Sequence, residues 1–369
     1  MRPFHLASTL EERASSLHNL PVVTGFDAFV DEMISVVDER SSLQNYRRIE
    51  TISDLGTAIS KSSGHSSLRE VVINQIDPGG CAINMGDGLA SLGVPVTTFA
   101  SAGDPIHPAF AEYANKAELI SWGVDPGRTL AFEFADGKLM FSAVSQLQKF
   151  HPDVLSDHLK DGRFRDACRM ASLIAITDWT LYPHMTRCWE YLFETVFSEL
   201  DHPRFFFDLV DPSTRSDTDI RAMLGVLERY RRHGEVTLGL NQNEANILSR
   251  LVDGKETSAT DCESASNQAV HLRESLGLQS IIIHSVRYAV GANASGTSHA
   301  LGPYCKKPKK STGAGDRFNA GYALGLILDL PLEDSLRVAV FCSGFFVREG
   351  RSATFSELVQ FIRDSEESQ

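Results

Sequence analysis

Short apolar runs alternate with segments of helical periodicity from about residue 90 onward. The runs cover residues 96–100, 173–177, 205–210, 236–240 and 281–284. Each run is too short for a buried helix, so each predicts a buried strand. Strands that alternate with helices in this way are typical of a largely parallel sheet with helices packed against it. The pattern therefore predicts an α/β fold with a doubly wound sheet.

Two of the segments between the runs carry apolar residues at helical spacing. The first has them at Phe110, Tyr113, Ala114, Ala117 and Ile120, and the second at Ile220, Met223, Leu224, Leu227 and Tyr230. Residues three and four positions apart lie on one face of a helix. We therefore expect amphipathic helices over about residues 110–120 and 220–230.

Two stretches depart from this alternation. In residues 129–141 two runs flank Asp136-Gly137, a pair that suits a two-residue type I′ hairpin turn. Residues 40–75 are irregular and rich in serine, with a weak helical pattern through Ile49, Ile52, Leu55 and Ile59. We interpret both stretches as parts of a small lid attached to the main domain.

The length of the chain suits one elaborated enzyme domain with a large core. We expect a single domain over residues 1–369, with lid segments at about 33–78 and 127–148. The formal net charge of -13 is spread along the chain. Because binding to a phosphate backbone requires a basic face, this charge argues against a nucleic-acid partner. Anionic substrates must then be held by local groups.

The cysteines and the apolar runs also limit where the protein acts. The six cysteines form no C-x-x-C pair, and no histidine cluster has zinc spacing. We therefore expect free thiols in a reducing cytoplasm. The N-terminal residues contain no signal-peptide core, and no apolar stretch approaches the roughly 20 residues of a membrane span.

The strongest chemical signal is the segment 311–316, S-T-G-A-G-D, which precedes a helical pattern. Small residues let backbone N–H groups point at a ligand, and a helix N-terminus adds partial positive charge, so this turn can hold an anion. A carboxylate at the same place, Asp316, can accept the proton of an attacking hydroxyl. The segment is not a Walker A loop, because no Gly-Lys-Ser/Thr follows the glycines. An isolated G-x-G-D would more often be a turn whose aspartate serves the helix.

The wider sequence supports the chemical interpretation, because residues 312–321 resemble the C-terminal signature of ribokinase-like (PfkB) carbohydrate kinases. The resemblance implies the ribokinase-like fold. It also implies that Gly313, Ala314 and Gly315 form the anion hole, that Asp316 is the catalytic base and that Thr312 contacts the nucleotide.

A second segment resembles the N-terminal signature of the same family. Residues 79–84, G-G-C-A-I-N, are followed by Gly93 and Gly103. The resemblance implies that Gly79 and Gly80 let a sugar approach the backbone and that Asn84 binds it. One position departs from the pattern, since Gly86 stands where serine, threonine or alanine is usual.

Residues 25–31, G-F-D-A-F-V-D, resemble the first strand of such kinases, which ends in an acid that binds substrate hydroxyls. The resemblance makes Asp31 the sugar ligand. Because the run is one residue longer than the commonest form, Asp27 remains an alternative for the role, and either acid could instead cap a turn.

Residues 241–244, N-Q-N-E, follow a predicted strand and resemble the N-x-x-E motif of the family. The resemblance implies that Asn241 and Glu244 position hydrated Mg²⁺ and the phosphates of the nucleotide. Taken alone, the same pattern is more often a helix start with asparagine as N-cap and glutamate at N3. Asp208 and Asp211 end another predicted strand, where each could lie near the metal or serve a turn.

The departures from the family pattern gather around the nucleotide. Residues 284–289 lack the glycines that usually form a turn there, and we expect His284 to be a core residue. Lys310 stands where the family most often has an acid that is associated with a bound monovalent cation. It belongs to a basic run that either lies in solvent or neutralises the triphosphate. Arg317 is unfavourable at a helix N-terminus unless a phosphate or carboxylate lies near it.

These observations predict an ATP-dependent sugar kinase that uses Mg²⁺ and transfers the γ-phosphoryl group of ATP to a sugar hydroxyl. The alternatives are a nucleoside kinase, a kinase with ADP as donor, and a non-catalytic module that senses a sugar or nucleotide. The altered nucleotide turn favours the last of these, whereas the intact Asp316 and its anion hole oppose it. The sequence leaves the sugar and the oligomeric state open, with a homodimer as one possibility.

Overall fold

A nine-stranded sheet forms the centre of the protein, and a computed structural model describes residues 6–254 and 258–367 of it. The ends of the expected domain, residues 1–5 and 368–369, lie outside this range. The strands run in the order β14-β13-β12-β11-β10-β9-β1-β5-β6. Their bounds are β1 Val22–Phe26, β5 Val96–Ala100, β6 Glu118–Ser121, β9 Leu173–Ile176, β10 Arg204–Asp208, β11 Glu235–Asn241, β12 Ser280–His284, β13 Tyr288–Asn293 and β14 Gly296–Leu301.

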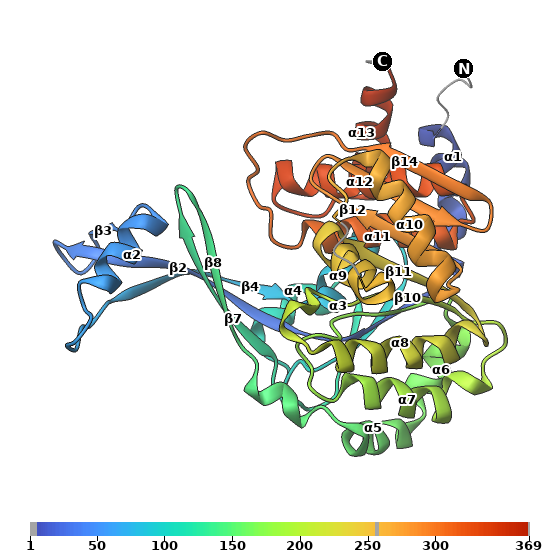
Figure 1. The fold of residues 1–369 in the computed structure, drawn as a ribbon, viewed down its shortest axis with the longest axis horizontal. Coiled ribbons are helices and arrows are strands. Elements are labelled where there is room, and N and C mark those ends of the chain that lie inside the picture. Colours follow the sequence, from blue (N-terminus) through green and yellow to red (C-terminus); the bar gives the residue numbers. More distant parts are fainter. Residues whose placement is uncertain (1–5, 255–257, 368–369) are drawn as a thin grey trace.

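Neighbouring strands from β6 to β12 are parallel, and β13 and β14 add an antiparallel edge. Helices cover both faces of this sheet (Figure 1). One face packs against α5 Pro152–His158, α6 Arg163–Met170, α7 Met185–Thr195, α8 Asp217–Arg231, α9 Gln242–Asp253 and α10 Cys262–Leu276. The other packs against α1 Leu6–Arg13, α3 Cys81–Ser91, α4 Ala111–Ala114, α11 Ala314–Ile327, α12 Leu332–Glu349 and α13 Phe355–Glu367. Two separate hydrophobic cores result, which confirms the doubly wound α/β architecture.

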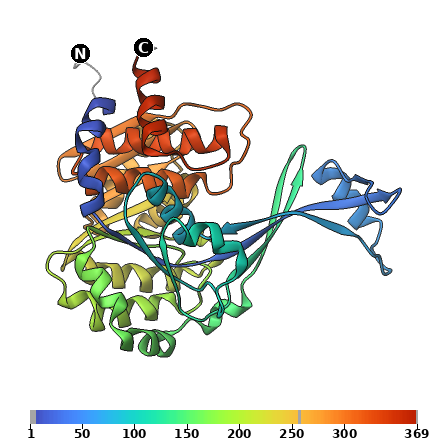
Figure 2. The same cartoon turned by 180° about the vertical axis from the view of Figure 1, so that it is seen from behind.

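A second sheet of five strands projects from one side of the main body (Figures 1 and 2). It has the order β3-β2-β7-β8, with β4 also paired to β2. Its elements are β2 Phe29–Arg40, β3 Tyr46–Arg48, β4 Val71–Gly79, β7 Gly127–Phe134 and β8 Gly137–Ala143, and α2 Ile52–Ser60 lies at its outer end. These elements fall largely in the two segments that we interpreted as a lid.

The predicted strands and the helix over residues 220–230 are confirmed, whereas the helix over residues 110–120 is wrong. There, α4 ends at Ala114 and Ile120 lies on strand β6. Phe110 and Tyr113 pack into the core on one face of the sheet, but Ile120 belongs to the core on the opposite face. The helical spacing of these residues therefore comes from two elements that face different cores.

The hairpin between β7 and β8 is confirmed, but its turn is displaced by one residue. Phe134 pairs with Gly137, so the turn residues are Ala135 and Asp136 instead of Asp136-Gly137. The carboxylate of Asp136 accepts a hydrogen bond of 2.9 Å from the backbone N–H of Ile52, at the first residue of α2. This long-range hydrogen bond links the Asp136 side chain in the turn to the start of α2. No helix in residues 6–254 or 258–367 is both long and apolar enough to cross a membrane.

Candidate active site

The carboxyl ends of the parallel strands gather polar residues at one edge of the main sheet. Asp27 follows β1 and Asp178 lies just beyond β9, while Asp208, Asn241 and His284 are the last residues of β10, β11 and β12. Strand order reverses at β1, which lies between β5 and β9. Ligands of open α/β sheets bind outside the carboxyl ends of the strands at such a reversal. The fold therefore brings these polar residues, three of them acids, to the place where a ligand is expected.

The glycine-rich segment forms the start of α11 and faces the same edge. Gly313 is the N-cap of the helix with φ of 85°, a left-handed conformation that favours glycine. The N–H of Ala314 donates to the carbonyl of Ser311 at 3.1 Å, so the N–H groups left for a ligand in the first turn are those of Gly315 and Asp316. This geometry matches the expected anion hole with a carboxylate at its mouth.

Asn84 and Asp316 lie together although they are far apart in the sequence. Asn84 is on α3, whose N-cap Gly80 has φ of 95°. Its Nδ2 donates a hydrogen bond of 2.9 Å to Oδ2 of Asp316. The two glycine-containing signatures thus meet in one site, with a sugar-binding candidate directly beside the candidate base.

Asp31 lies beside Gly79 at the base of the second sheet. It is on β2, opposite Asp77 on β4. A Cβ atom at Gly79 would overlap the carboxylate of Asp31, so this close approach requires glycine. Burial is the largest cause of a raised pKa for Asp31, and a hydrogen bond from Thr129 partly offsets it.

Asp27, the alternative acid, is fully buried and already engaged by the protein. Its carboxylate accepts hydrogen bonds from the backbone N–H groups of Cys81 and Ala82 and, at 2.6 Å, from the hydroxyl of Thr177. It therefore satisfies the first turn of α3. Burial raises the pKa of Asp27 to about 6, although these hydrogen bonds oppose the shift.

Asn241 and Glu244 form a complete capping box at the start of α9. Asn241 Oδ1 accepts the N–H of Glu244 at 3.0 Å, and the Glu244 carboxylate accepts the N–H and the Nδ2 of Asn241 at 2.8 and 2.6 Å. Burial raises the pKa of Glu244 well above 4.5, and the negative charge of Asp208 adds to the shift. The structure thus contains the helix start that the pattern alone favoured, and it also brings Glu244 close to the acidic edge.

Asp208 and Asp211, left open by the sequence, lie in different surroundings. Asp208 is buried, and its carboxylate accepts hydrogen bonds from the N–H of Val210 at 2.9 Å and from Nδ2 of Asn319 at 2.6 Å. Burial raises the pKa of Asp208 to about 7, and the charge of Asp316 adds to the shift. Asp211 is exposed and accepts the N–H of Ser213 at 3.0 Å, so it caps a turn.

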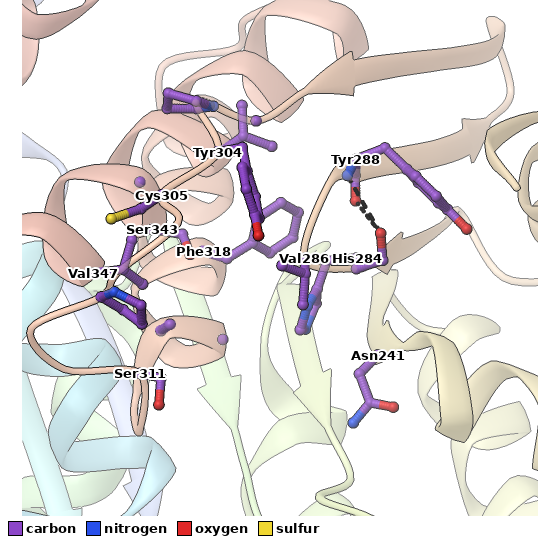
Figure 3. Close-up of a pocket in the computed structure, with 18 of the residues that line it drawn as sticks. Asn241, His284, Val286, Tyr288, Tyr304, Cys305, Ser311, Phe318, Ser343 and Val347 are labelled. Carbon is purple, nitrogen blue, oxygen red and sulfur yellow. Dashed lines mark hydrogen bonds between the residues drawn. The ribbon is translucent and has the colours of Figure 1, made fainter. Parts of the chain in front are cut away.

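A cavity of about 500 Å³ adjoins the anion hole, and Ser311, Ala314 and Gly315 are among the residues that line it. Figure 3 shows Tyr304, Phe318, His284 and Val286 around it, with Asn241 and Ser311 at its lower end. The ring of His284 packs against Phe318, with ring centroids 4.8 Å apart, and also lines the cavity. Burial lowers the pKa of His284 to about 4, so the imidazole is neutral at pH 7.

The strand connection next to this cavity needs no glycine. In the turn between β12 and β13, the N–H of Ser285 donates to the carbonyl of Tyr288 at 2.8 Å. No residue from 284 to 289 has a positive φ. The turn therefore forms without the glycines that are usual in the family. Val286 lies in this turn and extends the apolar wall of the cavity.

The basic residues around the anion hole are paired with acids. Lys310 Nζ lies 2.7 Å from Asp77 Oδ2, which excludes the expectation that it points only into solvent. Arg317 Nη2 lies 3.0 Å from Asp87 Oδ2. The Asp87 carboxylate therefore offsets the unfavourable position of this cation in the first turn of α11. The same guanidinium donates to Ser352 and approaches the carbonyl of Gly313.

The sequence did not point to Asp77, Asp87 or Lys138. Lys138 lies on β8 of the second sheet, and its Nζ donates to Thr312 Oγ1 at 3.3 Å. Asp77 precedes the paired glycines by two positions, and Asp87 lies one helical turn after Asn84. Both neighbourhoods could have drawn attention to these acids, whereas nothing local to Lys138 indicates Thr312.

Comparison with known proteins agrees with this geometry. Residues 4–365 match the family model described as prokaryotic ketohexokinase. A ketohexokinase from Haloferax volcanii is 28% identical over 344 residues, which cover 92% of this chain and 90% of that protein.

Solved structures of two sugar kinases share the fold. A ribokinase from Thermotoga maritima superposes with a TM-score of 0.62 at 15% identity, covering 93% of this chain and 99% of that one. Phosphofructokinase-2 from Escherichia coli gives a TM-score of 0.62 at 14% identity, covering 94% and 99%. This chain therefore belongs to the prokaryotic ketohexokinase family and is an ATP-dependent carbohydrate kinase with the ribokinase-like fold.

Proposed function

We propose that the protein transfers the γ-phosphoryl group of ATP to a primary hydroxyl of a ketohexose, with Asp316 as the catalytic base. Membership of the prokaryotic ketohexokinase family supports the acceptor class. The observation that carries the proposal is the 2.9 Å hydrogen bond between Asn84 and Asp316. It brings a sugar-binding candidate and a proton acceptor to the same helix N-terminus, which is what transfer to a sugar hydroxyl requires.

In the proposed mechanism, Asp31 and Asn84 hold the sugar so that one hydroxyl faces Asp316. Asp316 accepts the hydroxyl proton as the oxygen attacks the γ-phosphorus in line with the leaving ADP. The backbone N–H groups of Gly315 and Asp316, which have no backbone acceptor in the described part of the chain, stabilise negative charge on the phosphoryl oxygens. Gly79 and Gly80 keep this side of the site open, since a side chain at either position would meet Asp31 or Asp27.

The residues around Glu244 fit a hydrated Mg²⁺ better than one held directly by the protein. Both oxygens of the Glu244 carboxylate already accept hydrogen bonds from Asn241. Among the described residues, no three metal-binding side chains converge on one point. Asp208 and Glu244 are nevertheless buried close enough for the charge of one to raise the pKa of the other. Asn241, Glu244 and Asp208 would therefore hold the ion through its waters, and the ion would neutralise charge on the phosphates.

The cavity beside the anion hole is the proposed nucleotide site. It is lined mainly by apolar and aromatic groups, among them Tyr304, Phe318 and Val286. The neutral imidazole of His284 adds no charge to it. Thr312 follows the cavity-lining residue Ser311 and accepts a hydrogen bond from Lys138 of the second sheet, where it can contact the phosphates. ATP as donor and six unpaired cysteines support a cytoplasmic location.

A phosphoryl-transfer screen tests the proposal. The purified protein would be offered ketohexoses, aldohexoses, ribose and nucleosides, with ATP or ADP as donor, and the products would be separated and mapped by NMR. We expect the highest kcat/KM for a ketohexose with ATP. A preference for nucleosides or for ADP would replace the proposed acceptor or donor. Sugar binding by calorimetry without turnover under any condition would favour a sensing module.

A further inference from the structure

Lys138 occupies a position that the proposed mechanism does not use. It lies on β8, directly after the hairpin turn of the projecting sheet. Its ammonium group is 3.3 Å from the hydroxyl of Thr312, the residue before the glycine that caps α11. A cation carried by the lid sheet therefore lies at the mouth of the anion hole.

The candidate active site is strongly acidic, so a triphosphate needs positive charge there. Burial is the main cause of the raised pKa values of Asp27, Asp31, Asp208 and Glu244, and the charge of Asp316 adds to each, so each of these carboxylates lies near Asp316. Such a group of acids repels ATP unless cations offset it. The cations near the anion hole must therefore be assessed by how readily each can bind a phosphate.

Two of these cations are held firmly by buried acids. Lys310 is paired with Asp77, and Arg317 with Asp87, whose side chains are only 14% and 17% exposed. Removing a cation from a largely buried carboxylate is costly, because the acid would be left without a partner. Lys310 and Arg317 therefore serve the protein's own acids first.

Lys138 differs from these two in its acidic partner. It is 3.0 Å from Glu133, its cross-strand neighbour, and the Glu133 side chain is 47% exposed. Exposed ion pairs contribute little, and water can solvate the carboxylate once the pair opens. Its second partner, Thr312, is uncharged. Exchange of these partners for a phosphate oxygen therefore costs less at Lys138 than at the two buried pairs.

We propose that Lys138 is a further catalytic residue, which binds the transferred phosphoryl group from the lid side. The inference rests on the proposed kinase function. As the bond from the sugar oxygen to the γ-phosphorus forms and the bond to the ADP oxygen breaks, the ammonium group donates hydrogen bonds to the phosphoryl oxygens. It stays protonated throughout, and the hydroxyl proton goes to Asp316. Because the cation is carried by the second sheet, it contributes only when that sheet keeps the ammonium group beside Thr312, as it does here.

The first test compares Lys138→Met, which removes the charge, with Lys138→Arg, which keeps it. Lys61→Met, at the exposed C-terminal end of α2, is the control in the same lid. We expect kcat for ketohexose phosphorylation to fall roughly 10- to 100-fold in Lys138→Met, with a sugar KM within about twofold of wild type. Lys138→Arg should retain most of kcat. An unchanged kcat in Lys138→Met would overturn the inference.

The second test requires no turnover, so it separates this inference from the proposed function. Calorimetry with Mg²⁺ would compare ADP with an ATP analogue that has an imido bridge between the β- and γ-phosphorus. Lys138→Met should lower the affinity for the triphosphate analogue about 5- to 10-fold and leave the affinity for ADP unchanged, since the inference pairs Lys138 with the γ-phosphoryl oxygens. An equal loss for both nucleotides, or none, would overturn the inference even if the wild type phosphorylates sugars.

Glu133→Gln gives a matched test that keeps the lysine. This change removes the competing acid, so triphosphate affinity should stay the same or rise by up to about threefold. If Lys138→Met folds poorly, this variant still decides the matter. A loss of triphosphate affinity in Glu133→Gln would show that the Glu133–Lys138 pair itself is needed, and the inference would fail.

Discussion

The side chains of Asn84 and Asp316 are joined by a 2.9 Å hydrogen bond that spans 232 positions of the sequence. Asn84 comes from the first turn of α3 and Asp316 from the first turn of α11. Both helices begin at a glycine with positive φ. The first two N–H groups of α3 donate to Asp27, whereas those of Gly315 and Asp316 in α11 have no backbone acceptor among the described residues. The hydrogen bond fixes the orientation of the candidate base, and a sugar held by Asn84 lies next to that base.

Replacing Asp316 with asparagine should remove catalysis and spare binding. In Asp316→Asn, the new amide could still accept the hydrogen bond from Asn84 through its oxygen but could not accept the hydroxyl proton. We expect kcat to fall by about 10²- to 10⁴-fold, with Kd values for sugar and nucleotide near those of the wild type. Steady-state kinetic assays would measure kcat, and calorimetry would measure the Kd values. Asp201→Asn, with a fully exposed side chain, is the control. Retention of most of the wild-type rate would exclude Asp316 as the base.

Features that depend on nearby residues were predictable from the sequence. The buried strands are short and apolar, and the glycines at positions 80 and 313 are required by positive φ, so both leave a local signal. The residues that the sequence missed act across elements. Lys138 on the second sheet contacts Thr312 at the start of α11, 174 positions away in the sequence, and no pattern around position 138 indicates this contact.

Asp27 and Asp31 should respond differently to the same substitution. The Asp27 carboxylate accepts three hydrogen bonds, and Asp27→Asn would turn an NH₂ group toward one or more of these donors. The change should therefore lower the free energy of unfolding by about 1 to 3 kcal/mol. Asp31→Asn should leave stability near that of the wild type and raise the Kd for the ketohexose roughly 10- to 100-fold. Denaturant unfolding and calorimetry would measure both effects. The reverse pattern would make Asp27 the sugar ligand.

The N-x-N-E segment shows a physical limit on predicting an ion site from the sequence alone. The same atoms of Asn241 and Glu244 that would hold the waters of Mg²⁺ also satisfy the first turn of α9. A helix start and an ion site therefore require the same residues at the same spacing. The sequence pattern alone cannot distinguish a helix start from an ion site. The folded structure adds the information that Asp208 lies near Glu244.

Asp208 should make the stability of the protein depend on pH. Burial raises its pKa from 3.8 to about 7 in the folded chain. Between about pH 4 and pH 7 the folded chain keeps this proton while the unfolded chain has released it, so the free energy of unfolding falls as pH rises. Asp208→Asn removes this titration. Its stability relative to the wild type should rise across that window, by up to ~1.4 kcal/mol per pH unit, and level off above pH 7.

The replacement is compatible with its surroundings. The Oδ1 atom of Asn319 is buried without a hydrogen-bond partner, so a rotated Asn319 amide could accept from the new asparagine. Denaturant unfolding at several pH values, without nucleotide or metal, would measure the effect, with Asp201→Asn as the exposed control. A stability difference that does not change with pH would show that Asp208 titrates normally.

Lys310 should make the enzyme independent of potassium. In kinases that resemble this chain, an acid at this position is associated with a bound monovalent cation beside the anion hole. Here the ammonium of Lys310 lies 2.7 Å from Asp77, and its charge offsets part of the rise that burial causes in the pKa of Asp31. A covalently attached cation thus pairs with Asp77, which lies opposite the sugar-binding candidate Asp31. We expect equal kcat in potassium, sodium and tetramethylammonium salts at constant ionic strength.

Two variants of Lys310 distinguish a missing charge from a created ion site. Lys310→Asp would place a third carboxylate beside Asp77 and Asp31, so its activity should fall at least about tenfold in tetramethylammonium salt and recover partly in potassium. Lys310→Met removes the charge without adding an acid, so it should lose activity equally in all three salts. Direct chromatography of the phosphorylated sugar is the suitable assay, because it needs no coupling enzyme that itself responds to potassium. Strong activation of the wild type by potassium would mean that the lysine does not replace the ion.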